Sequence, residues 1–177
     1  TRLAATVNAK PADGSLDGTL SATNAIAGNV ASGRTPVRAL STRFAWRAES
    51  IALDDFSAEL EGGATATGNA RIGLGERAAG GRWTLDVRDL DARQLYAPLV
   101  TTRLAGSIVA DLDARRRTLT GNLVDRRFPG GLAVEFAAGF DDRMIELERF
   151  RARSGGAELA GRGRLGRDGQ RTFALDA

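Results

Sequence analysis

The chain has 177 residues, with 25 basic and 22 acidic side chains, no cysteine and no histidine. The absence of cysteine excludes disulfides and thiol chemistry, and the absence of histidine removes the commonest metal ligand and the usual general base. A net charge of +3 with acidic residues spread throughout does not indicate nucleic-acid binding. No apolar run approaches the ~20 residues that a membrane-spanning helix needs.

The first predicted strands alternate apolar or glycine side chains at even positions with mostly polar ones at odd positions. They cover residues 16–22 and 26–30, and residues 33–36 break the pattern. Because successive side chains of a strand point to opposite faces, this period of two predicts a sheet with one apolar and one polar face. The next strand presents Phe44 and Trp46 on its apolar side.

The longest alternation runs from residue 56 to residue 74 and recurs near the end of the chain. Residues 51–58 match residues 145–152 at an offset of 94 positions (145 − 51), and residues 62–73 match residues 155–166 at an offset of 93 (155 − 62). A three-residue loop at 61–63 and a two-residue Gly155-Gly156 turn explain the difference, with both glycines of the second turn at positive φ. These turns keep the apolar side chains on one face.

Two kinds of interruption are expected in this sheet. The pairs Asp54-Asp55 and Glu148-Arg149 shift the apolar positions from odd to even, which predicts β-bulges. Asp91 can cap a short helix over about residues 92–97, which Pro98 ends. Alternating strands then resume between residues 104 and 138, so we count roughly a dozen strands in all.

The predicted fold is therefore all-β, an elongated antiparallel sheet with one short helix. Because alanine and glycine are frequent on the apolar side, the pattern favours a curled sheet around an open apolar trough, while an ordinary closed core is the alternative. Residues 1–177 are expected to form a single segment of a longer β domain, with related units near 40–75 and 132–167.

The charged clusters give little support for enzymatic activity. Asp54-Asp55 and Asp141-Asp142 both fall at predicted turns, where aspartate binds the local backbone. The arginines at 115–117 could contact anionic lipid headgroups or an acidic partner, although a solvated hairpin tip is favoured. The glycine-rich segment 161–166 lacks the helix and the spacing of a phosphate loop. We expect no catalytic residue, no metal and no cofactor.

Four stretches, at residues 16–20, 56–73, 83–112 and 155–166, together resemble the AsmA-like superfamily of bridge-like lipid-transfer proteins, and within it the TamB family. The resemblance implies a β-taco, a long antiparallel sheet folded over so that its apolar face lines a groove. It also implies a periplasmic protein, anchored to the inner membrane of a Gram-negative bacterium, that carries phospholipid between the inner and outer membranes and has a linked role in outer-membrane assembly. Phospholipid acyl chains would be its ligands. A BamA-type outer-membrane barrel (TamA) would be its partner, through other parts of the full-length protein.

The larger apolar side chains of the predicted strands would line this groove. They are Phe44, Trp46, Ile51, Leu53, Phe56, Leu60, Ile72, Trp83, Leu85, Val87, Leu104, Ile108, Leu112, Leu119, Leu123, Leu132, Val134, Phe136, Ile145, Leu147, Phe150, Leu159 and Leu165.

Three other functions fit an alternating sheet. A β-solenoid or adhesin stalk would seal the apolar face as a core. Solenoid coils repeat every ~20–30 residues, however, whereas the two related units of this chain are offset by 93 to 94 positions. An outer-membrane barrel needs two aromatic girdles, and the chain has only two tryptophans and one tyrosine. A chaperone-like groove for the strands of outer-membrane proteins is the third alternative.

Overall fold

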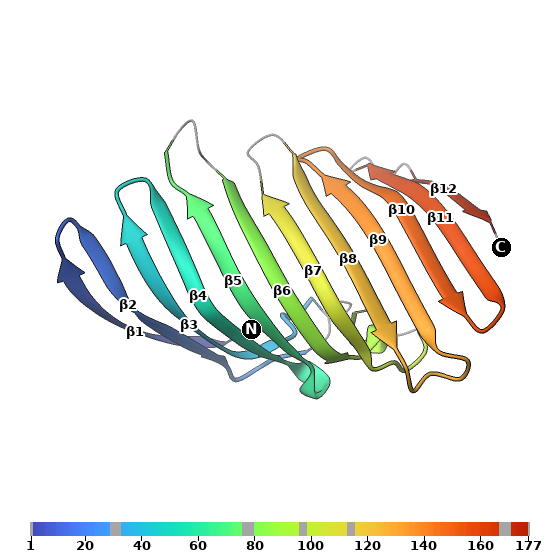
Figure 1. Cartoon of the computed structure of the whole chain (residues 1–177), viewed down its shortest axis with the longest axis horizontal. Helices are drawn as coiled ribbons and strands as arrows, with labels where there is room; N and C mark the ends of the chain where they lie inside the picture. Colours follow the sequence, from blue (N-terminus) through green and yellow to red (C-terminus); the bar gives the residue numbers. More distant parts are fainter. Residues whose placement is uncertain are drawn as a thin grey trace.

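The computed structural model describes residues 2–28, 33–75, 80–95, 99–112, 116–166 and 171–176. In these ranges twelve antiparallel strands form one sheet whose strand order follows the sequence (Figure 1). The strands are β1 (Leu3–Ala12), β2 (Ser15–Asn24), β3 (Val37–Arg47), β4 (Ser50–Leu60), β5 (Thr65–Gly73), β6 (Gly80–Leu90), β7 (Leu104–Leu112), β8 (Arg117–Asp125), β9 (Leu132–Phe140), β10 (Met144–Ser154), β11 (Ala157–Gly166) and β12 (Arg171–Asp176). The predicted all-β antiparallel fold with one short helix is confirmed.

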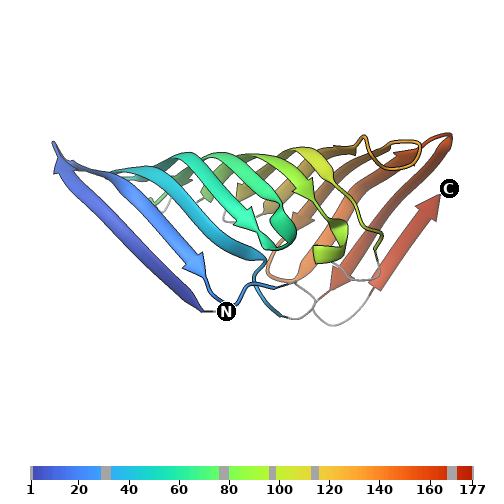
Figure 2. The ribbon, with the colours of Figure 1, turned by 90° about the horizontal axis from the view of Figure 1, so that it is seen from below.

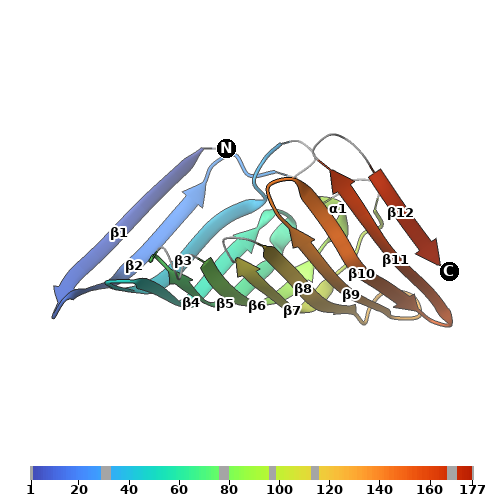
Figure 3. The same ribbon diagram turned by 90° about the horizontal axis from the view of Figure 1, so that it is seen from above.

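The sheet is open and uncurled, so the curl expected for a folded-over groove is not present. Strands β1 and β12 lie at opposite ends and do not pair with each other (Figures 1 and 3). In Figure 2, β1 and β2 slope in the opposite sense to β11 and β12, as expected for a sheet that twists steadily from strand to strand. The extensive contacts between strands join only neighbours in this order, so nothing in the described residues draws the two ends together.

A short helix, α1 (Ala92–Leu95), lies between β6 and β7, and a 3₁₀ turn, η2 (Glu61–Gly63), joins β4 to β5. The predicted cap of α1 is confirmed, because the Arg93 amide donates a hydrogen bond of 3.1 Å to Asp91 Oδ1. Residues 96–98, which include the end of the predicted helix and Pro98, lie outside the described residues.

The predictions for the first strands were partly wrong. Strand β1 was not predicted, and residues 25–28 do not form a strand, while residues 29–32 lie outside the described ranges. The buried side chain of Asn24 explains why β2 ends there. Its Oδ1 accepts hydrogen bonds from the amides of Arg2 and Ile26, and its Nδ2 donates to the Thr35 and Val37 carbonyls. These bonds replace the strand pairing that residues 26–28 would otherwise need.

The predicted bulges are confirmed by register shifts at Asp54-Asp55 in β4 and at Glu148-Arg149 in β10. Two further bulges, at Arg88-Asp89 in β6 and at Arg38 in β3, were not predicted. Asp55 and Asp89 have φ angles of 51° and 54°, a left-handed conformation that aspartate tolerates better than most residues. Each bulge inserts one residue where the apolar positions change parity, so all apolar side chains stay on one face.

The turns that distinguish the two related units are largely as predicted. The Leu60 amide donates to the Ala64 carbonyl at 2.8 Å across the three-residue loop, and Ser154 pairs with Ala157 across the two-residue turn. Gly155 has a φ of 57°, but Gly156 does not have a positive φ, so that part of the prediction was wrong. A two-residue turn with positive φ only at its first central residue is of the II′ kind.

Candidate functional site: the apolar face of the sheet

Strand register places every predicted lining residue on the same side of the sheet, which we call the apolar face. One row of paired positions crosses nine strands. It consists of Phe56, Gly68, Leu85, Ile108, Gly121, Phe136, Phe150, Gly161 and Leu175. Parallel rows contain the other predicted residues, for example Trp46, Ile51 and Ile72 in adjacent strands. The apolar face is therefore continuous from β1 to β12.

The buried part of this face is small and lies over the central strands, close to α1. Its core cluster consists of Ala64, Ala66, Val87, Leu90, Leu104 and Leu123, each less than a tenth exposed. Ala92 of α1 packs against this cluster, together with half-buried neighbours that include Leu60 and Ile108. In the part of the chain that the structure describes, no large side chain is fully buried. The short helix α1 therefore contributes to this buried part through Ala92.

Outside this cluster most of the predicted lining residues are half-buried, and some are exposed. Among the predicted residues, Trp46 is 46% exposed, Ile145 53% and Leu159 38%. The same face carries exposed side chains that were not predicted, which are Leu3, Val7, Phe173 and Leu175. They lie on the two strands at the ends of the sheet, where the alternation includes few large apolar residues or is cut short.

The total accessible surface agrees with a single uncovered layer. The chain exposes 11835 Å², whereas a compact protein of 18.6 kDa is expected to expose about 8,200 Å². A sheet in a globular protein normally packs one face against a second layer, and the described residues form no such layer.

Glycines let large side chains lie flat on this face. A Cβ atom at Gly121 would collide with the Phe136 ring, and one at Gly163 would collide with the Phe173 ring. Each ring therefore covers the bare backbone of the neighbouring strand. Because each ring lies over a glycine, it does not project far from the apolar face.

Two buried polar side chains, Thr102 and Asp125, hold the loops next to the core cluster in place by hydrogen bonds to their backbone. Thr102 Oγ1 accepts a hydrogen bond of 2.9 Å from the Ala92 amide and donates one of 3.0 Å to the Leu90 carbonyl. Asp125, at the end of β8, accepts from the amides of Arg103, Arg127 and Phe128. These bonds, above all the one from Arg103, lower the pKa of the Asp125 carboxyl below its usual value.

Asp141-Asp142 lies at a turn as predicted, but Asp54-Asp55 lies within β4 at its bulge, so the turn predicted there was wrong. Asp141 Oδ1 accepts from the amides of Arg143 and Met144, and these bonds lower the pKa of the Asp141 carboxyl. The guanidinium of Arg116 pairs with Glu146 and Glu148. Arg117 begins β8, and residues 113–115 lie outside the described ranges. The segment 161–166 belongs to β11.

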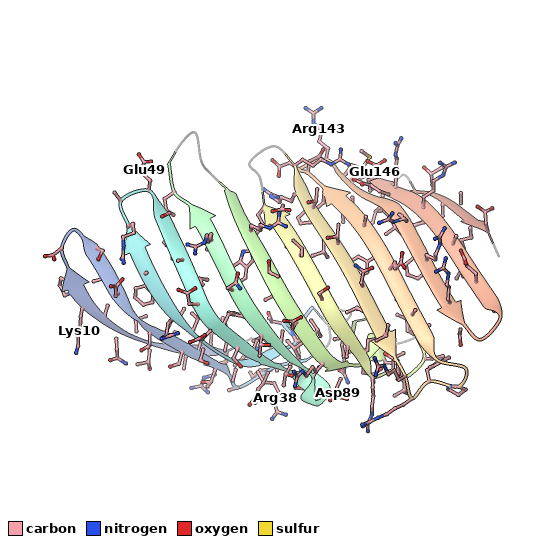
Figure 4. All side chains as sticks on the ribbon, viewed as in Figure 1. Lys10, Arg38, Glu49, Asp89, Arg143 and Glu146 are labelled. Carbon is pink, nitrogen blue, oxygen red and sulfur yellow. The ribbon has the colours of Figure 1, made fainter. Side chains whose placement is uncertain are left out.

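Figure 4 shows charged side chains at both edges formed by the strand ends, with Glu49, Arg143 and Glu146 near one edge and Arg38 and Asp89 near the other. Within the described residues no group of three or more acidic, histidine or cysteine side chains could bind a metal ion. None of the described helices is long and apolar enough to span a membrane.

Comparison with known proteins gave no match. No protein-family model, curated protein or solved structure matches the chain.

Proposed function

We propose that this chain is a segment of a TamB-like, AsmA-like protein whose apolar face carries phospholipid between the inner and outer membranes of a Gram-negative bacterium. The observation that supports it most directly is a continuous apolar face across twelve strands that no second layer of the described residues covers, so that most of its large side chains stay half-buried or exposed. Exposed apolar patches of this extent on a protein usually mark a binding surface. An acyl chain is the simplest apolar ligand that fits a long and mostly apolar surface.

The dimensions of the face suit acyl chains. Strands of 11 residues such as β4 and β10 span about 35 Å, and twelve strands side by side span about 50 Å. One leaflet of a bilayer has a hydrocarbon depth of about 15 Å, half of the ~30 Å core. An acyl chain can therefore lie across the face along a strand, with room for several lipids side by side.

A sealed core, as in a solenoid or adhesin stalk, agrees less well with the geometry. Sealing the apolar face requires a second layer, and the described residues contribute only α1 and its flanking segment. A chaperone-like groove for the strands of outer-membrane proteins would also use an exposed apolar face. It would in addition use the unpaired edges of β1 and β12, which are open to a further strand.

The location and the partner belong to the same proposal. The segment would lie in the periplasm as part of a protein anchored to the inner membrane, with a linked role in outer-membrane assembly. A BamA-type barrel (TamA) would contact other parts of the full-length protein. No residue of the segment would have a catalytic role, since its ligand is transported without chemical change.

Photo-crosslinking on the two faces tests this function. A photoreactive residue replaces Trp46 or Leu159 on the apolar face, or Val124 on the polar face, in the purified chain. Val124 is a suitable control because it is 43% exposed and thus as accessible as the other two. After incubation with phospholipid vesicles and irradiation, we expect lipid adducts by mass spectrometry at Trp46 and Leu159 but not at Val124. Equal labelling of both faces, or none on either, would refute the proposal.

A further inference from the structure

A hollow of about 290 Å³ lies at the edge of the apolar face where β9 turns into β10. It is lined by Arg117, Phe140, Asp141, Met144, Ile145, Leu165 and Gly166. Most of this lining is apolar, and Ile145 is 53% exposed. The volume is at the lower end of small-molecule sites, so the hollow suits a lipid headgroup rather than a whole lipid.

Arg117 brings a positive charge to this apolar edge. In the strand register it pairs with Leu112 on one side and with Phe140 on the other, so it occupies a position on the apolar face. Its side chain is 43% exposed. Among the described residues it forms one ion pair, a long contact of 3.5 Å from Nη1 to Asp142 Oδ1, and Asp142 is itself 82% exposed. A surface ion pair of this kind is weak and leaves most guanidinium donors available.

The preceding arginine is engaged differently. Arg116 lies against Gly139 and pairs with Glu146 and Glu148. In the register Gly139 pairs with Glu146 and belongs to the polar face. The two consecutive arginines therefore lie on opposite faces of the sheet, although their side chains are similarly exposed, Arg116 at 55% and Arg117 at 43%. Of the two, Arg117 borders the hollow.

We propose that Arg117 binds the phosphate of a phospholipid headgroup in this hollow while the acyl chains lie on the apolar face beyond Ile145. The inference rests on the proposed lipid-binding function and adds the position of the headgroup. A guanidinium offers paired donors that match phosphate oxygens, and Leu165 and Phe140 supply the apolar bed on which the chains begin.

The acidic residues around the hollow leave this site available to an anion. Oδ1 of Asp141 accepts from two backbone amides of its own turn, which offset part of its charge. Asp142 projects into solvent and competes for Arg117 only through the long ion pair. Arg143, at the same turn, adds a further positive charge near this edge (Figure 4).

The test compares two fluorescent lipids with identical acyl chains, phosphatidylglycerol and diacylglycerol, which differ in the phosphate headgroup. We expect the purified chain to bind phosphatidylglycerol about tenfold more tightly, the factor expected for hydrogen bonds to one charged group. Arg117→Gln should abolish this preference by weakening phosphatidylglycerol binding while leaving diacylglycerol binding unchanged. Arg116→Gln is the matched control and should leave both affinities unchanged. Asp142→Asn should strengthen phosphatidylglycerol binding a few fold, and it tests the site even if Arg117→Gln fails to fold.

The possible outcomes separate the headgroup site from the function on which it rests. If wild type binds both lipids equally and neither Arg117→Gln nor Asp142→Asn changes this, the headgroup site is wrong and the lipid-binding face still stands. If wild type binds neither lipid, the proposed function fails as well. Inorganic phosphate should not displace the lipid at equal concentration. Displacement would assign the hollow to free phosphate and overturn the inference.

Discussion

The central and the flanking strands of the sheet have the same alternation but bury their apolar side chains to very different extents. Leu123 in β8 is 5% exposed, whereas Leu175 in β12 is 68% exposed, although both lie on the apolar face. The difference comes from their surroundings, since Leu123 belongs to the core cluster, against which Ala92 of α1 also packs, whereas Leu175 lies on the edge strand β12 outside that cluster. The central strands therefore contribute most of the buried apolar contacts, whereas the flanking strands leave apolar side chains accessible to a ligand.

The largest effect should come from removing a covered side chain. Leu123→Ala is expected to destabilise the chain by about 2–3 kcal/mol, because it leaves a cavity in the core cluster. The same substitution at Leu175 should cost less than about 0.5 kcal/mol, because that side chain is mostly in water already. Urea denaturation of the two variants measures both values. Equal losses at the two positions would show that the centre is no better packed than the flank.

Asp125 should give the next largest effect. Asp125→Asn is expected to cost about 1–3 kcal/mol at pH 7, since an amide cannot accept from all three backbone donors. The pKa of Asp125 in the folded state lies below its usual value near 3.8. Its contribution is therefore fully present above that value and is lost as pH falls through the folded-state pKa. The difference between wild type and variant in urea unfolding should shrink below about pH 4. A difference that grows on acidification would contradict this account.

The cover itself can be loosened at Thr102. Thr102→Val keeps the shape of the side chain but removes its hydrogen bonds to Ala92 and Leu90, and should cost about 1–2 kcal/mol. We also expect faster hydrogen exchange at the Ala92 amide. Thr101→Val is the matched control, because Thr101 is exposed and accepts a long bond of 3.4 Å from Arg93. If both variants behave alike, Thr102 does not hold α1 over the core.

The smallest effect is expected in the uncovered flank, at the β10–β11 turn. Gly155→Val should cost about 1 kcal/mol through backbone strain, because Gly155 has a φ of 57°. Gly156→Val should cost much less, since Gly156 does not have a positive φ and a Cβ there meets no atom within 4 Å. Thermal unfolding of the two variants compares them. A larger loss at Gly156 would show that the turn is of another type.

The face on which each side chain lies was predictable from particular residues. The step from Leu53 to Phe56 predicted the bulge in β4, and the same kind of step from Val87 to Leu90 signals the missed bulge in β6. Strand β1 was missed because its apolar positions include only two large side chains, Leu3 and Val7. Residues 26–28 alternate as a strand would, but the buried hydrogen bonds of Asn24 draw them out of the sheet.

The sequence by itself determined the alternation, the bulges at parity changes, the cap at Asp91 and the lack of histidine and cysteine chemistry. These features depend on residues that are adjacent or a few positions apart, so local geometry decides them. Only the tertiary structure decided that the sheet is uncurled, that α1 packs against the core cluster and that Arg117 rather than Arg116 borders the hollow at the edge of the apolar face. Those features depend on register and on contacts between distant segments, because a side chain's exposure is set by what packs over it and not by its place in an alternating pattern.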